Sequence, residues 1–169
     1  YCIEITFKII ICNINEFLTL INSNKKILMS LDIGTKKTGV AFSDPSMQFS
    51  LASKVLFTQK NQLNFEIQNL ILNYDVGGLI VGLPINEDGS FNKKCQSIKD
   101  ITKNLDFLFI KNSIELPIFF WDESFSTQAA IEEVNLIIKK TRKQKTIVDK
   151  FAAKSILQDF LDYINKEKI

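Results

Sequence analysis

Four carboxylates stand at positions in this chain where they could do chemistry. Asp32 interrupts the otherwise apolar run Ile27–Ile33. Burying an unpaired charge is very costly, so this acid needs a metal ion, a cationic partner or a binding cleft. Asp122 and Glu123 follow directly on a second apolar run, and Asp149 lies near the start of a long helical pattern. These acids are the candidates for a reactive site.

The chain contains no histidine. This excludes catalysis by Ser-His-Asp or Cys-His arrangements, acid–base pairs of histidines and His-ligated zinc. Catalysis would have to rest on carboxylates, lysines, hydroxyls and metals held by oxygen ligands, which suit Mg²⁺ or Mn²⁺. Three carboxylates brought together without a cation repel one another, and divalent ions would offset that repulsion. Two such ions about 4 Å apart can activate water and stabilise the leaving oxygen in phosphodiester hydrolysis.

The elements that must position these acids follow from apolar periodicity. Asn13, with Glu16 three residues later, predicts a capping box that opens a short helix. The patterns predict strands over 27–33, 39–42, 52–58, 76–82 and 117–121, and helices over 62–73, 92–109, 127–138 and 147–165. Three early strands can form an antiparallel meander, whereas the later ones alternate with helices and must join in parallel. Ligand sites in such sheets lie outside the carboxyl ends of the parallel strands.

This rule predicts a site formed by Asp32, the turn at Gly82–Pro84 and the Asp122–Glu123 pair, because all three lie at strand C-termini. The last helix can join them. Ala152, Ala153 and Ile156 share a face with Asp149, and the small alanines would let that helix sit close on the sheet. Asp149 would then approach Asp32 and Glu123. The alternative interpretation is structural: acids of this kind also cap turns and favour helix starts.

A basic segment precedes and enters the last helix. Its cations could hold a phosphate backbone, although a solvated loop is the ordinary role of such a charge run. We also expect two lysines of the first hairpin to bind nucleic acid. The candidate contacts are Lys36, Lys37, Lys139, Lys140, Arg142, Lys143 and Lys145, with Lys150 adding a further cation beside Asp149.

The composition limits the kinds of protein that this chain can be. The chain has 169 residues, of which 46% are hydrophobic, so one domain with a full core is expected, and we expect its 14 phenylalanines to lie in that core. The net charge is only +2, so a nucleic-acid surface must come from local clustering. Three scattered cysteines without metal-type spacing indicate a reducing compartment. With no apolar run of the ~20 residues that a membrane span needs and no signal-peptide pattern, we expect a cytoplasmic protein without membrane contact.

Four ordered segments resemble the blocks of the YqgF/RuvX family, bacterial proteins similar to Holliday-junction resolvases. The resemblance covers about Ile27 to Ile164, and the four blocks in order are quite specific. The blocks are Asp32–Gly39 (DIGTKKTG), Val81–Gly89 (VGLPINEDG), Trp121–Thr127 (WDESFST) and Val148–Leu161 (VDKFAAKSILQDFL).

The resemblance implies an α/β, ribonuclease H-like three-layer fold. Its sheet would be mixed and five-stranded, in the order 3-2-1-4-5 with strand 2 antiparallel and helices on both faces. That domain would span residues 27–166, preceded by an N-terminal extension, residues 1–26, with the short helix. By the family pattern, Asp32, Glu123 and Asp149 are the catalytic and metal-binding acids for Mg²⁺ or Mn²⁺. One departure is Ser124, which stands where the family usually has arginine, so the site is one cation short.

The function that the resemblance implies is maturation of the 5′ end of the small-subunit ribosomal RNA precursor by a metal-dependent nuclease, endonucleolytic or exonucleolytic. Its partners would be that RNA, with ribosomal particles as a further partner, and the protein would be a monomer or homodimer. Cleavage of branched DNA is an alternative, because chemistry at the phosphate is shared and surface shape selects the substrate. A non-catalytic RNA-binding assembly factor is a second alternative, which Ser124 favours. A sugar-kinase or actin-like ATPase, suggested by Asp-x-Gly-Thr, would need two domains around its nucleotide, and the length supplies one.

Overall fold

The structure is a computed structural model that describes residues 11–57, 62–125 and 144–166, without the side chains of residues 125 and 144–150. The chain forms one mixed sheet in the order β3-β2-β1-β4-β5. β1 is antiparallel to β2 and parallel to β4, which is parallel to β5. This confirms the predicted sheet. The strands are β1 Ile27–Ile33, β2 Lys37–Ser43, β3 Ser50–Phe57, β4 Val76–Leu83 and β5 Ile118–Asp122.

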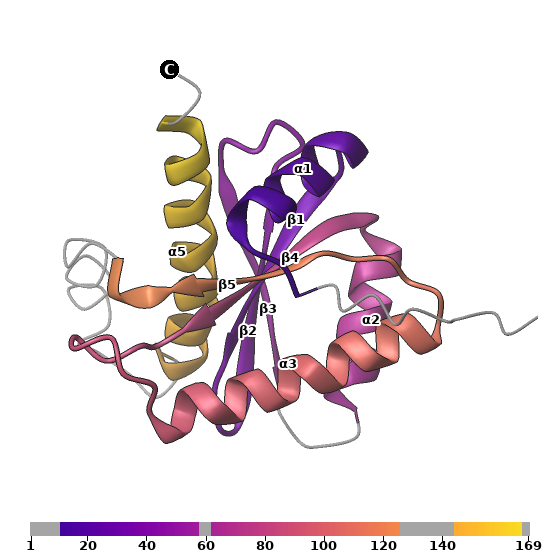
Figure 1. Cartoon of the computed structure of the whole chain (residues 1–169). Helices are drawn as coiled ribbons and strands as arrows, with labels where there is room; N and C mark the ends of the chain where they lie inside the picture. Colours follow the sequence, from indigo (N-terminus) through magenta and orange to yellow (C-terminus); the bar gives the residue numbers. More distant parts are fainter. Residues whose placement is uncertain (1–10, 58–61, 126–143, 167–169) are drawn as a thin grey trace, which may run out of the picture.

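Helices cover both faces of the sheet, which gives the expected three layers (Figure 1). α1 and α5 pack on one face, and α2 and α3 on the other. The predicted helix over 127–138 and the cations at 139, 140, 142 and 143 lie outside the described residues. The helices are α1 Ile14–Asn24, α2 Leu63–Asn73, α3 Lys93–Lys111 and α5 Gln144–Lys166, with a short 3₁₀ helix, η1, at Glu123–Phe125.

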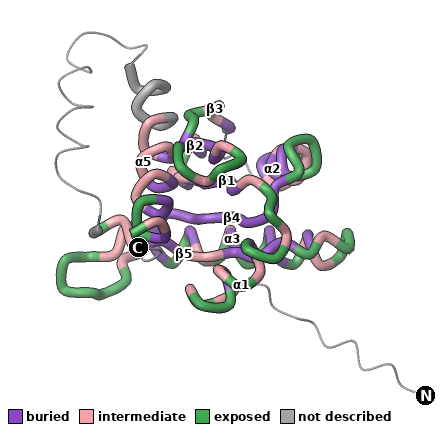
Figure 2. The backbone as a smooth tube through the Cα atoms, turned by 90° about the horizontal axis from the view of Figure 1, so that it is seen from above, coloured by how far each residue is buried: buried purple, intermediate pink, exposed green. Residues whose placement is uncertain are grey.

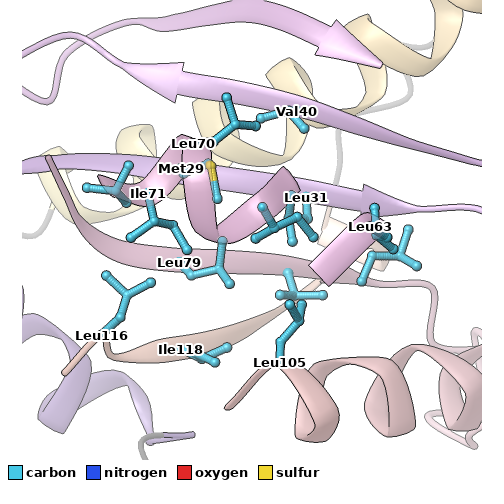
Figure 3. Packing of buried hydrophobic residues seen from close by; sticks show 14 of the residues in the cluster. Met29, Leu31, Val40, Leu63, Leu70, Ile71, Leu79, Leu105, Leu116 and Ile118 are labelled. Carbon is cyan, nitrogen blue, oxygen red and sulfur yellow. The ribbon is translucent and has the colours of Figure 1, made fainter. Parts of the chain in front are cut away.

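The sheet separates two apolar clusters. On the α2/α3 face, Leu31 and Leu79 of the sheet pack with Leu70 and Leu105 of the helices, and Figure 3 shows these side chains meeting in one layer. On the α1/α5 face, Ile80 and other sheet residues pack with helix residues that include Leu157 and Phe160. All eight residues of β4 are buried, as a strand covered on both faces requires (Figure 2).

α1 is part of the second cluster. The predicted capping box is confirmed: the Glu16 amide donates to the Asn13 side chain at 3.0 Å, and the Asn13 amide donates to the Glu16 carboxylate at 3.2 Å. Phe17 and Ile21 are fully buried, and Gly78 leaves the space that they fill. The boundary at residue 26 between an extension and a ribonuclease H-like domain stays a prediction, and α1 packs against the sheet of that domain.

The expectation that the phenylalanines lie in the core is wrong for several of them. Five described phenylalanines are largely exposed, each with more than half of its surface accessible. They lie on the edge strand β3, on the outer sides of helices, or in the segments next to these elements, where the neighbouring positions already fill the core. The five are Phe49, Phe57, Phe65, Phe91 and Phe107.

Candidate active site

The sheet register brings the predicted strand ends together. Leu31 of β1 pairs with Val81 of β4, so the next residues, Asp32 and Gly82, lie near each other close to the ends of their strands. Gly82 in turn pairs with Trp121 of β5, two residues before Glu123. The parallel strands β1, β4 and β5 therefore end at one edge, as expected for a ligand site of an open α/β sheet.

The side chain of Asp32 lies on the α5 face of the sheet, because side chains alternate between the two faces along a strand. The hydroxyl of Ser30 donates to the backbone carbonyl of Ala153 in α5 at 2.7 Å, in a buried contact. Asp32 lies two residues further along the strand and therefore on the same face. Ala153 is fully buried, so the small residue predicted to let this helix approach the sheet does so. The site faces α5.

Gly82 has no side chain, and the carboxylate of Glu123, the residue that follows β5, occupies the space that a side chain would take. A Cβ at this position would lie 2.5 Å from a carboxylate oxygen of Glu123 and would also overlap Cδ1 of Ile156. Any side chain here would therefore displace Glu123, Ile156 or both. The glycine in the second sequence block is thus explained by a close approach, and Glu123 lies directly over the end of β4.

Burial and a neighbouring negative charge together raise the pKa of Glu123. Loss of hydration raises the pKa of this carboxyl to about 7, and the negative charge of Asp32 acts in the same direction. Asp32 and Glu123 are therefore close enough to repel through space. Lys94 of α3 acts in the opposite direction and favours the ionised form. A half-buried pair of interacting carboxylates at the ends of parallel strands is an arrangement typical of functional sites.

The two acids after β5 have different roles. The Asp122 carboxylate accepts a hydrogen bond from the Ser124 backbone amide at 2.9 Å, which caps the turn into η1. This contact supports the structural interpretation for Asp122. Glu123 instead reaches back over β4. Ser124 itself is exposed.

The structure gives the position of some of the other predicted site residues, and for two of them it describes the backbone alone. Asp149 lies in the N-terminal part of α5, the helix that packs against β1, β2 and β3, and its side chain is outside the described residues. Lys36 is exposed in the turn after β1, and Lys37, half-buried, begins β2. Lys145 lies in the first turn of α5, and nothing is described of its side chain.

Sequence reasoning missed Lys94. One signal was available: α3 begins with Lys93 and Lys94 and has no acid in its first turn. Cations at a helix N-terminus oppose the helix dipole, so such a pair calls for another explanation.

The carboxylate oxygens of this site are suitable ligands for a hard divalent cation. Asp32 and Glu123 offer only oxygen atoms, and their mutual repulsion is what a bound cation relieves. Among the residues whose side chains are described, no three histidine, cysteine, aspartate or glutamate side chains are grouped as a metal site would need. The third predicted ligand, Asp149, is outside that set.

No helix of the described part of the chain is long and apolar enough to cross a bilayer.

The chain is similar to proteins that are named as nucleases or resolvases. A family model described as "RuvX: Holliday junction resolvase" matches residues 26–163. A protein of Pelagibacter ubique is 34% identical over 145 residues, covering 85% of this chain and 93% of its own. One of Roseobacter denitrificans is 38% identical over 153 residues, covering 88% and 90%. Both carry the name "Putative pre-16S rRNA nuclease".

Solved structures of other proteins have a similar fold. Thermus thermophilus RuvC superimposes with a TM-score of 0.53 at 10% identity, covering 81% of this chain and 96% of RuvC. The RuvC complex with a Holliday junction substrate gives a TM-score of 0.52 at 6% identity, covering 83% and 96%. At such low identity these likenesses show a shared ribonuclease H-like fold alone. The family model and the curated relatives carry the assignment further, and by them this chain belongs to the RuvX family of nucleases.

Proposed function

We propose that this protein is a divalent-metal-dependent nuclease that processes the 5′ end of the small-subunit ribosomal RNA precursor. The observation that carries the proposal is the half-buried, mutually repelling pair of Asp32 and Glu123 at the carboxyl ends of β1 and β5. A pair of this kind costs stability and has no structural benefit in a well-packed core, whereas it suits binding of a cation and a phosphate.

Mg²⁺ or Mn²⁺ would be held by Asp32, Glu123 and Asp149. When bound, such ions activate a water molecule and stabilise the leaving oxygen. The chain's own residues supply the rest. Gly82 lets Glu123 lie against β4, and the bond from Ser30 to Ala153 fixes α5 on the sheet beside Asp32.

Phosphate contacts would come from the lysines near this edge. Lys36 and Lys37 follow Asp32 at the turn between β1 and β2, and the predicted basic segment enters α5 just before Asp149. Such contacts position a nucleic acid without reading its sequence.

The ribosomal RNA precursor is proposed because the curated relatives are named for it. Branched DNA is the second candidate, favoured by the description of the family model. A non-catalytic assembly factor is the third, and Ser124 in place of the family's usual arginine favours it.

The deciding experiment is cleavage of labelled substrates by the purified protein with Mn²⁺ or Mg²⁺. The panel holds a precursor fragment that spans the mature 5′ end, an unrelated single-stranded RNA and a four-way DNA junction. We expect cleavage of the precursor, and its loss by at least about a thousand-fold in Asp32→Asn, Glu123→Gln and Asp149→Asn. Circular dichroism and thermal unfolding verify that each variant folds.

Each outcome selects one function. Preferred cutting of the junction would replace the RNA proposal by the DNA one. Binding of RNA without any cutting would favour the assembly factor. Full activity in one of the three variants would remove that acid from the catalytic set.

A further inference from the structure

A cleft of about 650 Å³ opens next to the carboxylate pair, on the opposite face of the sheet. One wall is the turn after β1, at Gly34 and Thr35. The other walls are the first turn of α2 and the part of α3 from Lys93 to Asn104. Ile33 also lines the cleft and directly follows Asp32, so the cleft begins one residue from the proposed catalytic acid.

The residues that line the cleft are apolar, neutral and polar, or positively charged. Leu63 and Ile98, both buried, give an apolar floor, and Ile101 lies beside them. Asn64, Ser97 and Asn104 also line the cleft, and their side chains carry neutral hydrogen-bonding groups. Lys93 and Lys94 are exposed and supply the charge, and none of the described residues that line the cleft carries a carboxylate.

This combination matches a nucleotide. The described lining includes no aromatic ring for stacking, so a base would pack its flat face against aliphatic side chains. Amides and hydroxyls can bond to the edge of the base, and lysines bind phosphate. The volume fits a small ligand of drug-like size, which is one or two nucleotides and much less than a duplex.

Lys94 connects the cleft to the carboxylates. It lines the cleft, and its charge also acts on Glu123. A strand whose phosphate lay at Asp32 and Glu123 would therefore cross the edge of the sheet beside Lys94 as it entered the cleft. The two lysines stand in the first turn of α3 against the helix dipole, so they are not there to stabilise the helix.

We propose that this cleft binds one or two unpaired nucleotides of the substrate strand, next to the phosphate that is cut. This inference rests on the proposed nuclease function, and it makes a single-stranded flank part of the substrate. A fully paired duplex cannot enter the cleft, so it would bind through the backbone contacts alone.

Two variants test the cleft in different ways. Lys93→Ser/Lys94→Ser removes its charges, and Ser97→Trp fills it without changing the charge. The matched controls are Lys103→Ser/Lys111→Ser, which removes two lysines from the same helix, and Phe107→Trp, which places a tryptophan at an exposed position of that helix. None of the control residues lines the cleft.

The measurement is fluorescence anisotropy with a short labelled single-stranded RNA, and with the same strand annealed to its complement, without divalent metal. We expect both cleft variants to weaken single-strand binding by about ten-fold and to weaken duplex binding much less. The controls should bind like the wild type, and all proteins should unfold at similar temperatures.

Cleavage by the wild type separates this proposal from the nuclease function. A single-strand defect in the cleft variants would support the cleft even if the wild type cut nothing. Normal single-strand binding by both variants, an equal loss on duplex, or no binding by the wild type would overturn the cleft proposal, even if the wild type cleaved RNA.

Discussion

Among the described residues, two carboxyls on the α1/α5 face have raised pKa values, and one of the two lies in the candidate active site. Loss of hydration raises the pKa of Glu123 to about 7 and that of Asp159 to about 6. Glu123 lies at the strand ends with Asp32 and Lys94. Asp159 lies in α5 and lines a cavity of about 480 Å³ beside β5, together with Asp122, Asp162 and Lys166. A raised pKa therefore identifies a desolvated acid, and position at the strand ends identifies the candidate catalytic one.

Asp159→Asn should stabilise the protein in a pH-dependent way. The folded pKa is about 6 against an ordinary 3.8, with Asp162 adding repulsion, so the ionised form is penalised in the folded state. The penalty is absent well below pH 3.8, is still small at pH 4, grows as the pH rises to about 6, and stays constant above. Because the side chain is only half-buried, we expect a gain of only about 1 kcal/mol above pH 6. Urea unfolding at pH 4 and pH 8 measures it.

Cleavage by Asp159→Asn should match the wild type, since this residue lies away from the carboxylate pair. A gain that was equal at both pH values would contradict the proposed origin. An active-site role for Asp159 would show as lost cleavage.

At the scale of elements, the site depends on how closely α5, β4 and the end of β5 approach one another. Ala153 is buried against Ser30, and Gly82 has no side chain to separate Glu123 from the strand. Small residues on two elements thus set the position of an acid on a third.

Gly82→Ala should therefore damage both stability and activity. Its Cβ would overlap Ile156 and the Glu123 carboxylate, and overpacking of this kind typically costs about 1 to 3 kcal/mol. We expect cleavage to fall further than stability explains, because Glu123 is displaced. Thermal unfolding and single-turnover cleavage measure the two effects.

The double variant Gly82→Ala/Ile156→Val separates them. Removing Cδ1 of Ile156 relieves one of the two overlaps, so stability should recover in part while cleavage stays low. Recovery of both together would show that the loss of activity came from destabilisation alone.

At the scale of the whole molecule, a net charge of +2 makes the distribution of charge more important than its sum. The lysines of the hairpin turn and of the first turn of α3 lie near the edge of the sheet that carries the acids. The predicted basic segment enters α5 from residues outside the described ranges. A nucleic acid bound across this edge would contact sequence-distant cations at the same time.

Neutralising Lys140, Arg142 and Lys143 should weaken RNA binding and flatten its salt dependence. If all three contact phosphate, the slope of log affinity against log salt should fall in magnitude by about 2 to 3. Titrations at several salt concentrations measure it, with Lys54→Gln on the edge strand β3 as a control. An unchanged slope would leave these residues as a solvated charge run.

Much of this protein follows from local sequence. The apolar run that carries Asp32 near its end and the run that ends before Asp122–Glu123 mark the strand ends, and alternation of later strands with helices requires parallel pairing. Together they predict the edge of the sheet at which these acids lie. The capping box at Asn13 and Glu16 is likewise a local property. The strand ends, the parallel pairing and the capping box are predicted correctly because the periodicity of side chains and the ends of elements depend on neighbours in the chain.

Only the tertiary structure decided the rest. Lys94 acts on Glu123 although the rest of α3 and all of β5 separate them along the chain, because a parallel crossover returns the chain to the same edge of the sheet. The space over Gly82, the cleft beside Ile33, and the exposure of Phe91 and Phe107 depend on which surfaces meet across the sheet. Such contacts join residues far apart in sequence, and no local pattern encodes their distances.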